Sequence, residues 1–163
     1  MTTRINAAGY IKTGLGQAML ALQHQVETSG LEHSLMELVK IRTSQINGCA
    51  YCLDMHTKDA RALGETEQRI YALNAWRETP FFTDRERAAL EWAEALARIS
   101  VDQVPDSVYE IARKEFSEKE LVDLTMAVIA INGWNRIAIP FRNEVGSYQP
   151  AAEVAAAAPG STR

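Results

Sequence analysis

Apolar residues recur along most of this chain at the three- and four-residue spacing of helices that bury one face. No stretch alternates apolar and polar residues for long enough to predict a strand. The pattern predicts helices over residues 10–29, 31–46, 49–63, 66–76, 83–99 and 106–116, and a last helix over 117–131. That helix continues into the most apolar part of the chain, 121–139, which Gly133 is expected to interrupt and Pro140 to end. The predicted fold class is therefore all-α, with about seven helices.

Short polar motifs mark where several of these helices are expected to begin. In a capping box, a hydroxyl accepts a backbone N–H at the start of a helix while a carboxylate three residues later reaches back. Asn47 is expected to cap the helix that carries both cysteines, after Asn47-Gly48 interrupts the preceding one. Three pairs have the capping-box spacing: Thr83 with Glu86, Ser117 with Glu120, and Ser34 with Glu37.

The helical pattern fails after Gly146. Residues 147–163 carry no apolar face of any size, so they are predicted to be a disordered tail and residues 1–146 a single helical domain. The chain has 163 residues, of which 47% are hydrophobic, which suits one domain with its own core.

Charge and hydropathy limit the classes of molecule that this protein is expected to bind. The net charge of −4 and the pI of about 5.4 disfavour nucleic acid or an anionic membrane surface, since both attract a basic patch. No apolar run approaches the roughly 20 residues of a membrane span, and the first residues lack the apolar core of a signal peptide. We therefore expect a cytoplasmic protein whose partners are small molecules or proteins.

The candidate chemistry lies in one short segment. Its two cysteines, Cys49 and Cys52, are the only ones in the chain. On a helix that begins at Asn47, Cys52 lies about 300° and His56 about 340° around from Cys49, so all three share a face. The helix N-terminus favours a thiolate, and His56 can take the thiol proton. Glu37 would orient the imidazole if the two helices pack together, which makes the segment a candidate thiol redox centre.

Simpler interpretations of the same residues stay open. The cysteines fit ordinary small core residues, and Cys49, Cys52 and His56 are ligand types for zinc, although the fourth ligand of a structural zinc site is missing. Glu37 fits a capping role as well as a catalytic one. Trp134 fits the core or a subunit interface as well as a pocket.

The cysteine segment and its surroundings resemble a known family. The residues that carry the likeness are Glu37-x-x-Lys40-x-Arg42-x-Ser44-x-x-Asn47-x-Cys49-x-Tyr51-Cys52-x-x-x-His56, continued by Asp59-Ala-Arg61-x-x-Gly64 and by Ile131-Asn-x-Trp134-Asn135-Arg136. This pattern resembles the alkylhydroperoxidase-D-like branch of the carboxymuconolactone decarboxylase family, over roughly residues 17–141. The resemblance implies an all-α fold assembled as dimers, trimers or hexamers.

The resemblance also implies a peroxidase cycle without a cofactor or a metal. Cys52 would attack the peroxide and become a sulfenic acid, Cys49 would condense with it to a disulfide, and an external dithiol or redox protein would reopen that disulfide. Glu37 and His56 match the proton-relay positions of the family. On physical grounds alone, Cys49 is the better nucleophile, because it lies nearer the helix N-terminus.

One position departs from the family pattern. Tyr51 stands where the best-studied members carry a second histidine between the cysteines, and a tyrosine is a poor base near neutral pH. The alternative function is therefore a redox-responsive regulatory or thiol–disulfide exchange module without significant peroxidase turnover. Asn47, Tyr51, Trp134 and Asn135 are candidate pocket or supporting residues.

Overall fold

The structure, a computed structural model, describes residues 2–151. Within that range the chain is helical and contains no strand, so the all-α prediction is confirmed. The elements are α1 (Ala8–Ile11), α2 (Leu15–Glu27), α3 (His33–Asn47), α4 (Ala50–Ala62), α5 (Glu67–Ala72), the 3₁₀ helix η1 (Leu73–Glu78), α6 (Asp84–Ala97), α7 (Ile99–Asp102), α8 (Asp106–Glu115) and α9 (Glu118–Phe141).

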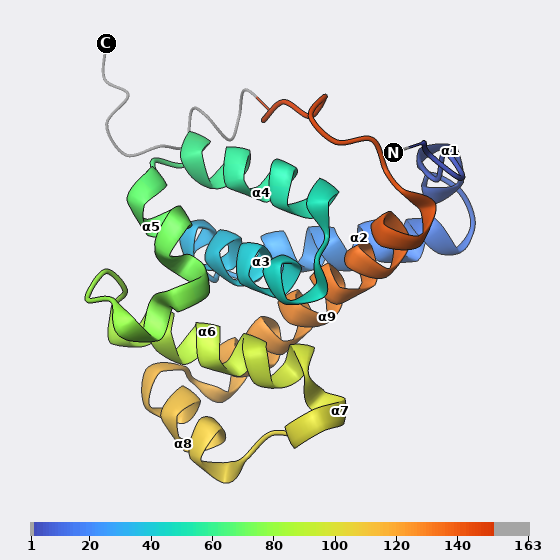
Figure 1. Cartoon of the computed structure of the whole chain (residues 1–163). Coiled ribbons are helices and arrows are strands. Elements are labelled where there is room, and N and C mark those ends of the chain that lie inside the picture. The colour runs from blue at the N-terminus through green and yellow to red at the C-terminus, as the bar shows by residue number, and fades with distance from the viewer. Residues whose placement is uncertain (1, 152–163) are drawn as a thin grey trace.

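Helix α3 lies at the centre of the fold, packed against α4, α6 and α9 (Figure 1). Every residue from Leu35 to Ser44 is buried, so no side of this helix faces solvent along that stretch. A helix buried on all sides normally carries apolar residues throughout. Here five of the ten buried residues are polar or charged, and their side chains need partners inside the protein: Glu37, Lys40, Arg42, Thr43 and Ser44.

The apolar side chains of α3 divide the core into two clusters. Met36 and Val39 belong to a cluster shared with α2, α6, α8 and α9. Leu38 and Ile41 belong to a second cluster shared with α4, α5, η1 and α6. On the remaining face of α3, Glu37 contacts His56 of α4 and Ser44 contacts the second half of α9, whereas Arg42 pairs with Glu94 of α6.

Most predicted helix boundaries agree with the structure within a few residues, and the exceptions have local causes. The capping boxes of Thr83 with Glu86 and of Ser117 with Glu120 are both present. The single helix predicted over 10–29 is two helices, α1 and α2, because Gly14 takes a positive φ of 53° at the N-cap of α2. The short helix α7 was not predicted.

The last helix corrects the sequence prediction at two positions. Gly133 does not interrupt α9, and Pro140 lies inside it. At Gly133 helix α2 crosses closely: a Cβ at this position would lie 2.7 Å from Met19 Cε. Pro140 is tolerated because, in the final turn, its missing N–H removes only one helical hydrogen bond.

The chain returns to α4 after α9. Residues up to Tyr148 run back along α4, on the side away from α6 (Figure 1). The first residues of the predicted tail are therefore held by specific contacts, whereas 152–163 lie outside the described residues. Among the described helices, none has both the length and the apolar character that a membrane crossing requires.

Candidate active site

The two cysteines lie at a sharp turn between α3 and α4. Gly48 ends α3 with a left-handed φ of 70°, a conformation that glycine adopts without steric cost. Cys49, not Asn47 as predicted, is the N-cap of α4, because Asn47 still belongs to α3. The backbone N–H of Cys52 donates to Cys49 Sγ at 3.3 Å, so a sulfur does what a serine or aspartate oxygen does at other helix starts.

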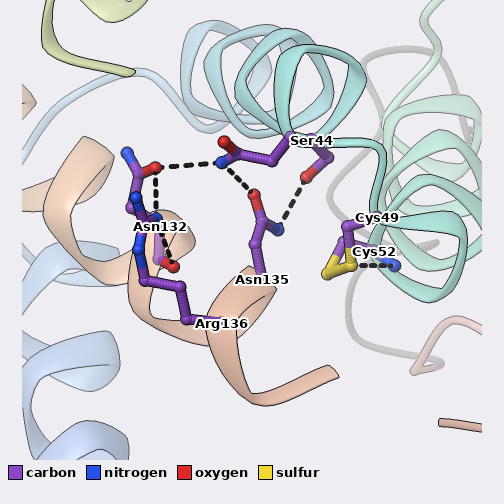
Figure 2. Close-up of a disulfide and its surroundings, with 7 residues drawn as sticks. Ser44, Cys49, Cys52, Asn132, Asn135 and Arg136 are labelled. Carbon is purple, nitrogen blue, oxygen red and sulfur yellow. Dashed lines mark hydrogen bonds between the residues drawn. A yellow bond between two sulfur atoms is a disulfide. The ribbon is translucent and has the colours of Figure 1, made fainter. Parts of the chain in front are cut away.

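Cys49 and Cys52 form a disulfide (Figure 2). Their Cα atoms are 5.3 Å apart, as expected for two residues separated by one turn, and neither is a free thiol. Both are buried, with 0% and 1% of their surface exposed. They pack with Ile131 and Ala138 of α9, and Tyr51 and Trp134 lie against the same cluster. A reagent therefore reaches the sulfurs only after a covering side chain moves.

Glu37 joins α3 to α4 through a buried contact with His56. Its Oε2 lies 2.9 Å from His56 Nδ1, and its Oε1 accepts a hydrogen bond from Lys40 Nζ at 2.8 Å. The capping role that stayed open for Glu37 is absent: Glu32 is the N-cap of α3, so Glu37 lies a full turn inside the helix. The expected pairing of Glu37 with His56 across the two helices is confirmed by this contact.

The two carboxyl groups near His56 differ electrostatically. Burial raises the pKa of Glu37, but the hydrogen bonds and charges of His56 and Lys40 outweigh it and hold that pKa at about 2. Asp59, on the next turn of α4, places Oδ2 4.0 Å from His56 Nδ1. Burial raises the pKa of Asp59, and the negative charge of Glu37 raises it further, against the hydrogen bond that Tyr148 donates.

The same three side chains offer atoms of the type that ligate metals. Glu37, His56 and Asp59 place one ligand atom each within 4.8 Å of one another. The Lys40 ammonium already supplies a positive charge to Glu37, and the Tyr148 hydroxyl donates to Asp59 at 2.7 Å. The carboxylates of Glu37 and Asp59 therefore already have hydrogen-bond donors, and a bound cation would have to displace them.

An amide network fixes α3 against α9 beside the disulfide (Figure 2). Asn47 Nδ2 donates to Asn135 Oδ1 at 2.8 Å and to Asn132 Oδ1 at 2.9 Å. Asn135, fully buried, donates to Ser44 Oγ at 3.2 Å, and Arg136 donates to the Asn132 side chain at 2.8 Å. Asn47 and Asn135 thus brace the helix end from which the cysteine turn departs.

Two aromatic side chains pack against the cysteine cluster: Trp134 from α9 and Tyr51 from α4. Trp134 is half-buried, and its indole N–H donates to Gln23 Oε1 of α2 at 3.1 Å. Tyr51 lies in the first turn of α4 and is also half-buried. Both side chains thus lie next to the buried disulfide.

Sequence reasoning missed three members of the site. Lys40 and Asp59 were part of the recognised pattern but were given no role, and Tyr148 was placed in the predicted tail. Asp59 follows His56 by one helical turn, a spacing that would have indicated the contact. No local signal predicted Tyr148, because its contact with α4 depends on how the whole chain folds.

Thr43 Oγ1 is buried, and within residues 2–151 it has no hydrogen-bond partner.

The geometry supplies the parts of thiol redox chemistry. A dithiol pair at a helix N-terminus can form a thiolate and a disulfide. An imidazole one turn further along α4, hydrogen-bonded to an ionised carboxylate, can take and return a proton.

Comparison with known proteins identifies the family. The family model of the carboxymuconolactone decarboxylase family matches residues 14–95, half of the chain, including both cysteines. The uncharacterized protein YdfG of Bacillus subtilis is 46% identical over 129 residues, which cover 79% of this chain and 88% of that protein.

Two solved structures share the fold. A protein of unknown function from Agrobacterium tumefaciens, assigned provisionally to the AhpD antioxidant defence proteins, is 45% identical and superposes with a TM-score of 0.81, covering 92% of this chain and 99% of its own. An uncharacterized peroxidase-related protein from Silicibacter sp. TM1040 is 26% identical, with a TM-score of 0.70, covering 85% and 71%. The chain belongs to the carboxymuconolactone decarboxylase family and has the all-helical fold of its AhpD-like members.

Proposed function

We propose that this protein is a cofactorless thiol peroxidase, which reduces hydrogen peroxide or organic hydroperoxides by cycling between the Cys49–Cys52 dithiol and its disulfide. The observation that carries the proposal is the placement of that disulfide on the same helix as His56, whose imidazole is 2.9 Å from ionised Glu37. The likeness to structures connected with antioxidant defence and peroxidases supports the same reaction class.

In the proposed cycle the Cys52 thiolate attacks the terminal oxygen of the peroxide. The S–O bond forms as the O–O bond breaks, and the departing alkoxide or hydroxide takes a proton and leaves as an alcohol or water. Cys49 then attacks the sulfenic sulfur, so that the S–S bond forms and the S–O bond breaks with loss of water. Two exchanges with an external dithiol restore both thiols and oxidise that dithiol to a disulfide.

His56 and Glu37 carry the proton in this proposal. His56 takes the thiol proton and returns it to the leaving oxygen, while Glu37, ionised at neutral pH, stabilises the imidazolium that forms. Tyr51 and Trp134 line the entry to the sulfurs, and Asn47 and Asn135 hold the turn that presents them. Activated thiols are needed because a free thiol, with a pKa of about 8.5, is only a few per cent ionised near neutral pH.

One contact favours the reverse order of attack. The N–H that Cys52 donates to Cys49 Sγ would stabilise a thiolate on Cys49. Trapping of the sulfenic acid with dimedone in Cys49→Ser and Cys52→Ser, followed by mass spectrometry, separates the two orders. Adduct in Cys49→Ser alone supports attack by Cys52, and adduct in Cys52→Ser alone reverses the roles.

Burial of the disulfide favours a second candidate function, a redox-responsive regulatory or thiol–disulfide exchange module. Both sulfurs lie behind side chains, so oxidation and reduction would be coupled to movement at the α3–α4 turn. Such a module would react with peroxide once and slowly, and its oligomeric state or partner contacts would change with the disulfide.

We also propose that the chain is a homo-oligomer, a dimer, trimer or hexamer. Val122, Met126 and Ile129 lie on one exposed face of α9, with 61%, 37% and 50% of their surfaces accessible. Light scattering after gel filtration measures the assembly, and Ile129→Glu should shift it toward smaller species if α9 is the interface. An unchanged mass would place the interface elsewhere.

The first experiment is a thiol titration of reduced, metal-free protein before and after one equivalent of cumene hydroperoxide, followed by turnover with excess dithiothreitol. We expect two thiols to be lost together in the wild type, and slow loss in Cys52→Ser and His56→Ala. His24→Ala is the matched control, because His24 is an exposed histidine on α2. Thiols that survive the peroxide would refute the peroxidase. Rapid single oxidation without turnover would favour the regulatory module.

A further inference from the structure

The segment after α9 is fastened to α4 by contacts on successive turns. Gly146 N donates to Asp54 Oδ2 at 3.0 Å, and Lys58 Nζ donates to the Tyr148 carbonyl at 2.9 Å. The Tyr148 hydroxyl then donates to Asp59 Oδ1 at 2.7 Å. The chain thus delivers a tyrosine to the helix that carries both cysteines, from a point 89 residues beyond Asp59.

Asp59 lies between Tyr148 and His56. One of its carboxylate oxygens takes the Tyr148 hydrogen bond, and the other is 4.0 Å from His56 Nδ1, which Glu37 also contacts. The titratable groups around this imidazole come from three segments: Glu37 and Lys40 from α3, Asp59 from α4, and Tyr148 from the C-terminal segment, with Tyr51 of α4 near enough to Tyr148 to interact with its charge.

The two carboxylates are suited to different tasks. Glu37 is held ionised by Lys40 and His56, so it exchanges no proton near neutral pH. The pKa of Asp59 is raised by burial and by the charge of Glu37, and the Tyr148 hydrogen bond opposes that rise. Without the tyrosine hydroxyl, Asp59 would more readily take up a proton and lose the charge that faces His56.

We propose that Asp59 stabilises the proton that His56 takes from the cysteine thiol, and that Tyr148 is a positioning residue that holds the Asp59 carboxylate against the imidazole. The inference rests on the proposed thiol chemistry and extends it to the C-terminal segment. Thiol ionisation moves one proton from sulfur to the imidazole, and the second negative charge beside the ring favours that transfer.

The test is the pH dependence of thiol alkylation by iodoacetamide in the reduced full-length protein, which reports thiolate without peroxide. For Asp59→Asn we expect the midpoint of the rate to move to higher pH by roughly half to one unit, because a neutral amide no longer stabilises the imidazolium. For Tyr148→Phe we expect a smaller move in the same direction. Peroxide oxidation at pH 7 should slow by roughly 3- to 10-fold in Asp59→Asn and by less in Tyr148→Phe.

Matched controls use the same chemical changes elsewhere. Tyr71→Phe removes an exposed hydroxyl that also donates to a carboxylate, Glu67, at 3.2 Å. Asp123→Asn removes a carboxylate paired with Lys119 on α9. Neither should change the alkylation profile. The double variant Asp59→Asn/Tyr148→Phe should match Asp59→Asn alone, since Tyr148 acts through Asp59.

The outcomes separate this inference from the proposed function. Profiles of Asp59→Asn that superimpose on the wild type, or a Tyr148→Phe effect that multiplies with it, would overturn the inference whatever the peroxide result. A wild type that resists peroxide but shows the expected shift in alkylation would refute the peroxidase and leave the role of Asp59 standing. Wild-type thiols that do not alkylate at all would refute both.

Discussion

The change Glu37→Gln tests the electrostatics of the site through stability. The substitution keeps the shape of the side chain but removes the charge that pairs with His56 and Lys40. Folding lowers the pKa of Glu37 from its ordinary 4.5 to about 2, a difference of about 2.5 pH units. At about 1.4 kcal/mol per unit, the ionised carboxylate contributes roughly 3 kcal/mol to the free energy of unfolding at pH 7.

The sign of the pH dependence follows from the lowered pKa. The unfolded chain binds a proton at Glu37 more readily than the folded one, so stability from this group is complete above about pH 5 and declines as the pH falls toward 2. Near pH 3 roughly half of the contribution should remain. The gap between wild type and Glu37→Gln should therefore be about 3 kcal/mol at pH 7 and roughly half of that at pH 3.

The assay is guanidinium chloride unfolding of the disulfide-intact protein at one fixed protein concentration and at pH 3, 5 and 7. Glu110→Gln is the control, because Glu110 is exposed in the middle of α8 and should leave stability unchanged. A gap below about 1 kcal/mol at pH 7, or a gap of the same size at pH 3 and pH 7, would refute the account of Glu37 as a strongly stabilised anion.

Three further changes probe packing and buried polar groups by the same unfolding assay. Gly133→Ala should be neutral or stabilise by up to about 1 kcal/mol, because alanine favours the helix and the terminal methyl of Met19 can move aside; a loss of more than about 1 kcal/mol would mean that α2 cannot adjust. Asn135→Leu should cost about 1–3 kcal/mol, since the Ser44 hydroxyl loses its buried donor, and an unchanged midpoint would show that the network is dispensable. Glu94→Ala should cost about 3–5 kcal/mol because it strips the acceptor from a buried guanidinium of α3 and an indole of η1; a cost under about 1 kcal/mol would contradict that pairing.

Local sequence signals predicted helix starts correctly where the interactions that decide them lie within one helical turn. The capping boxes at Thr83 and Ser117 satisfy N–H groups within one turn, so they form wherever the helix forms. The Ser34 and Glu37 pair has the same spacing, yet the box does not form. The contact with His56 of α4 and the ion pair with Lys40 of the same helix bind the carboxylate more strongly than a backbone N–H would.

Glycine and proline gave the least reliable signals. Gly133 and Pro140 are usual helix breakers, but α9 passes through both. The rest of α9 outweighs the roughly 1 kcal/mol that glycine costs a helix interior in the first case, and the position in the last turn decides the second. Neither fact is encoded in the residues next to these positions.

The sequence by itself determined the all-helical class and the reactive pair, because helical periodicity and a two-residue spacing between cysteines are local properties. It also pointed to His56, which follows Cys52 by one turn of the same helix. Only the tertiary structure decided which groups surround that histidine. Glu37 reaches it from α3 and Tyr148 reaches Asp59 from beyond α9, and such contacts depend on helix packing and chain return rather than on spacing along the chain.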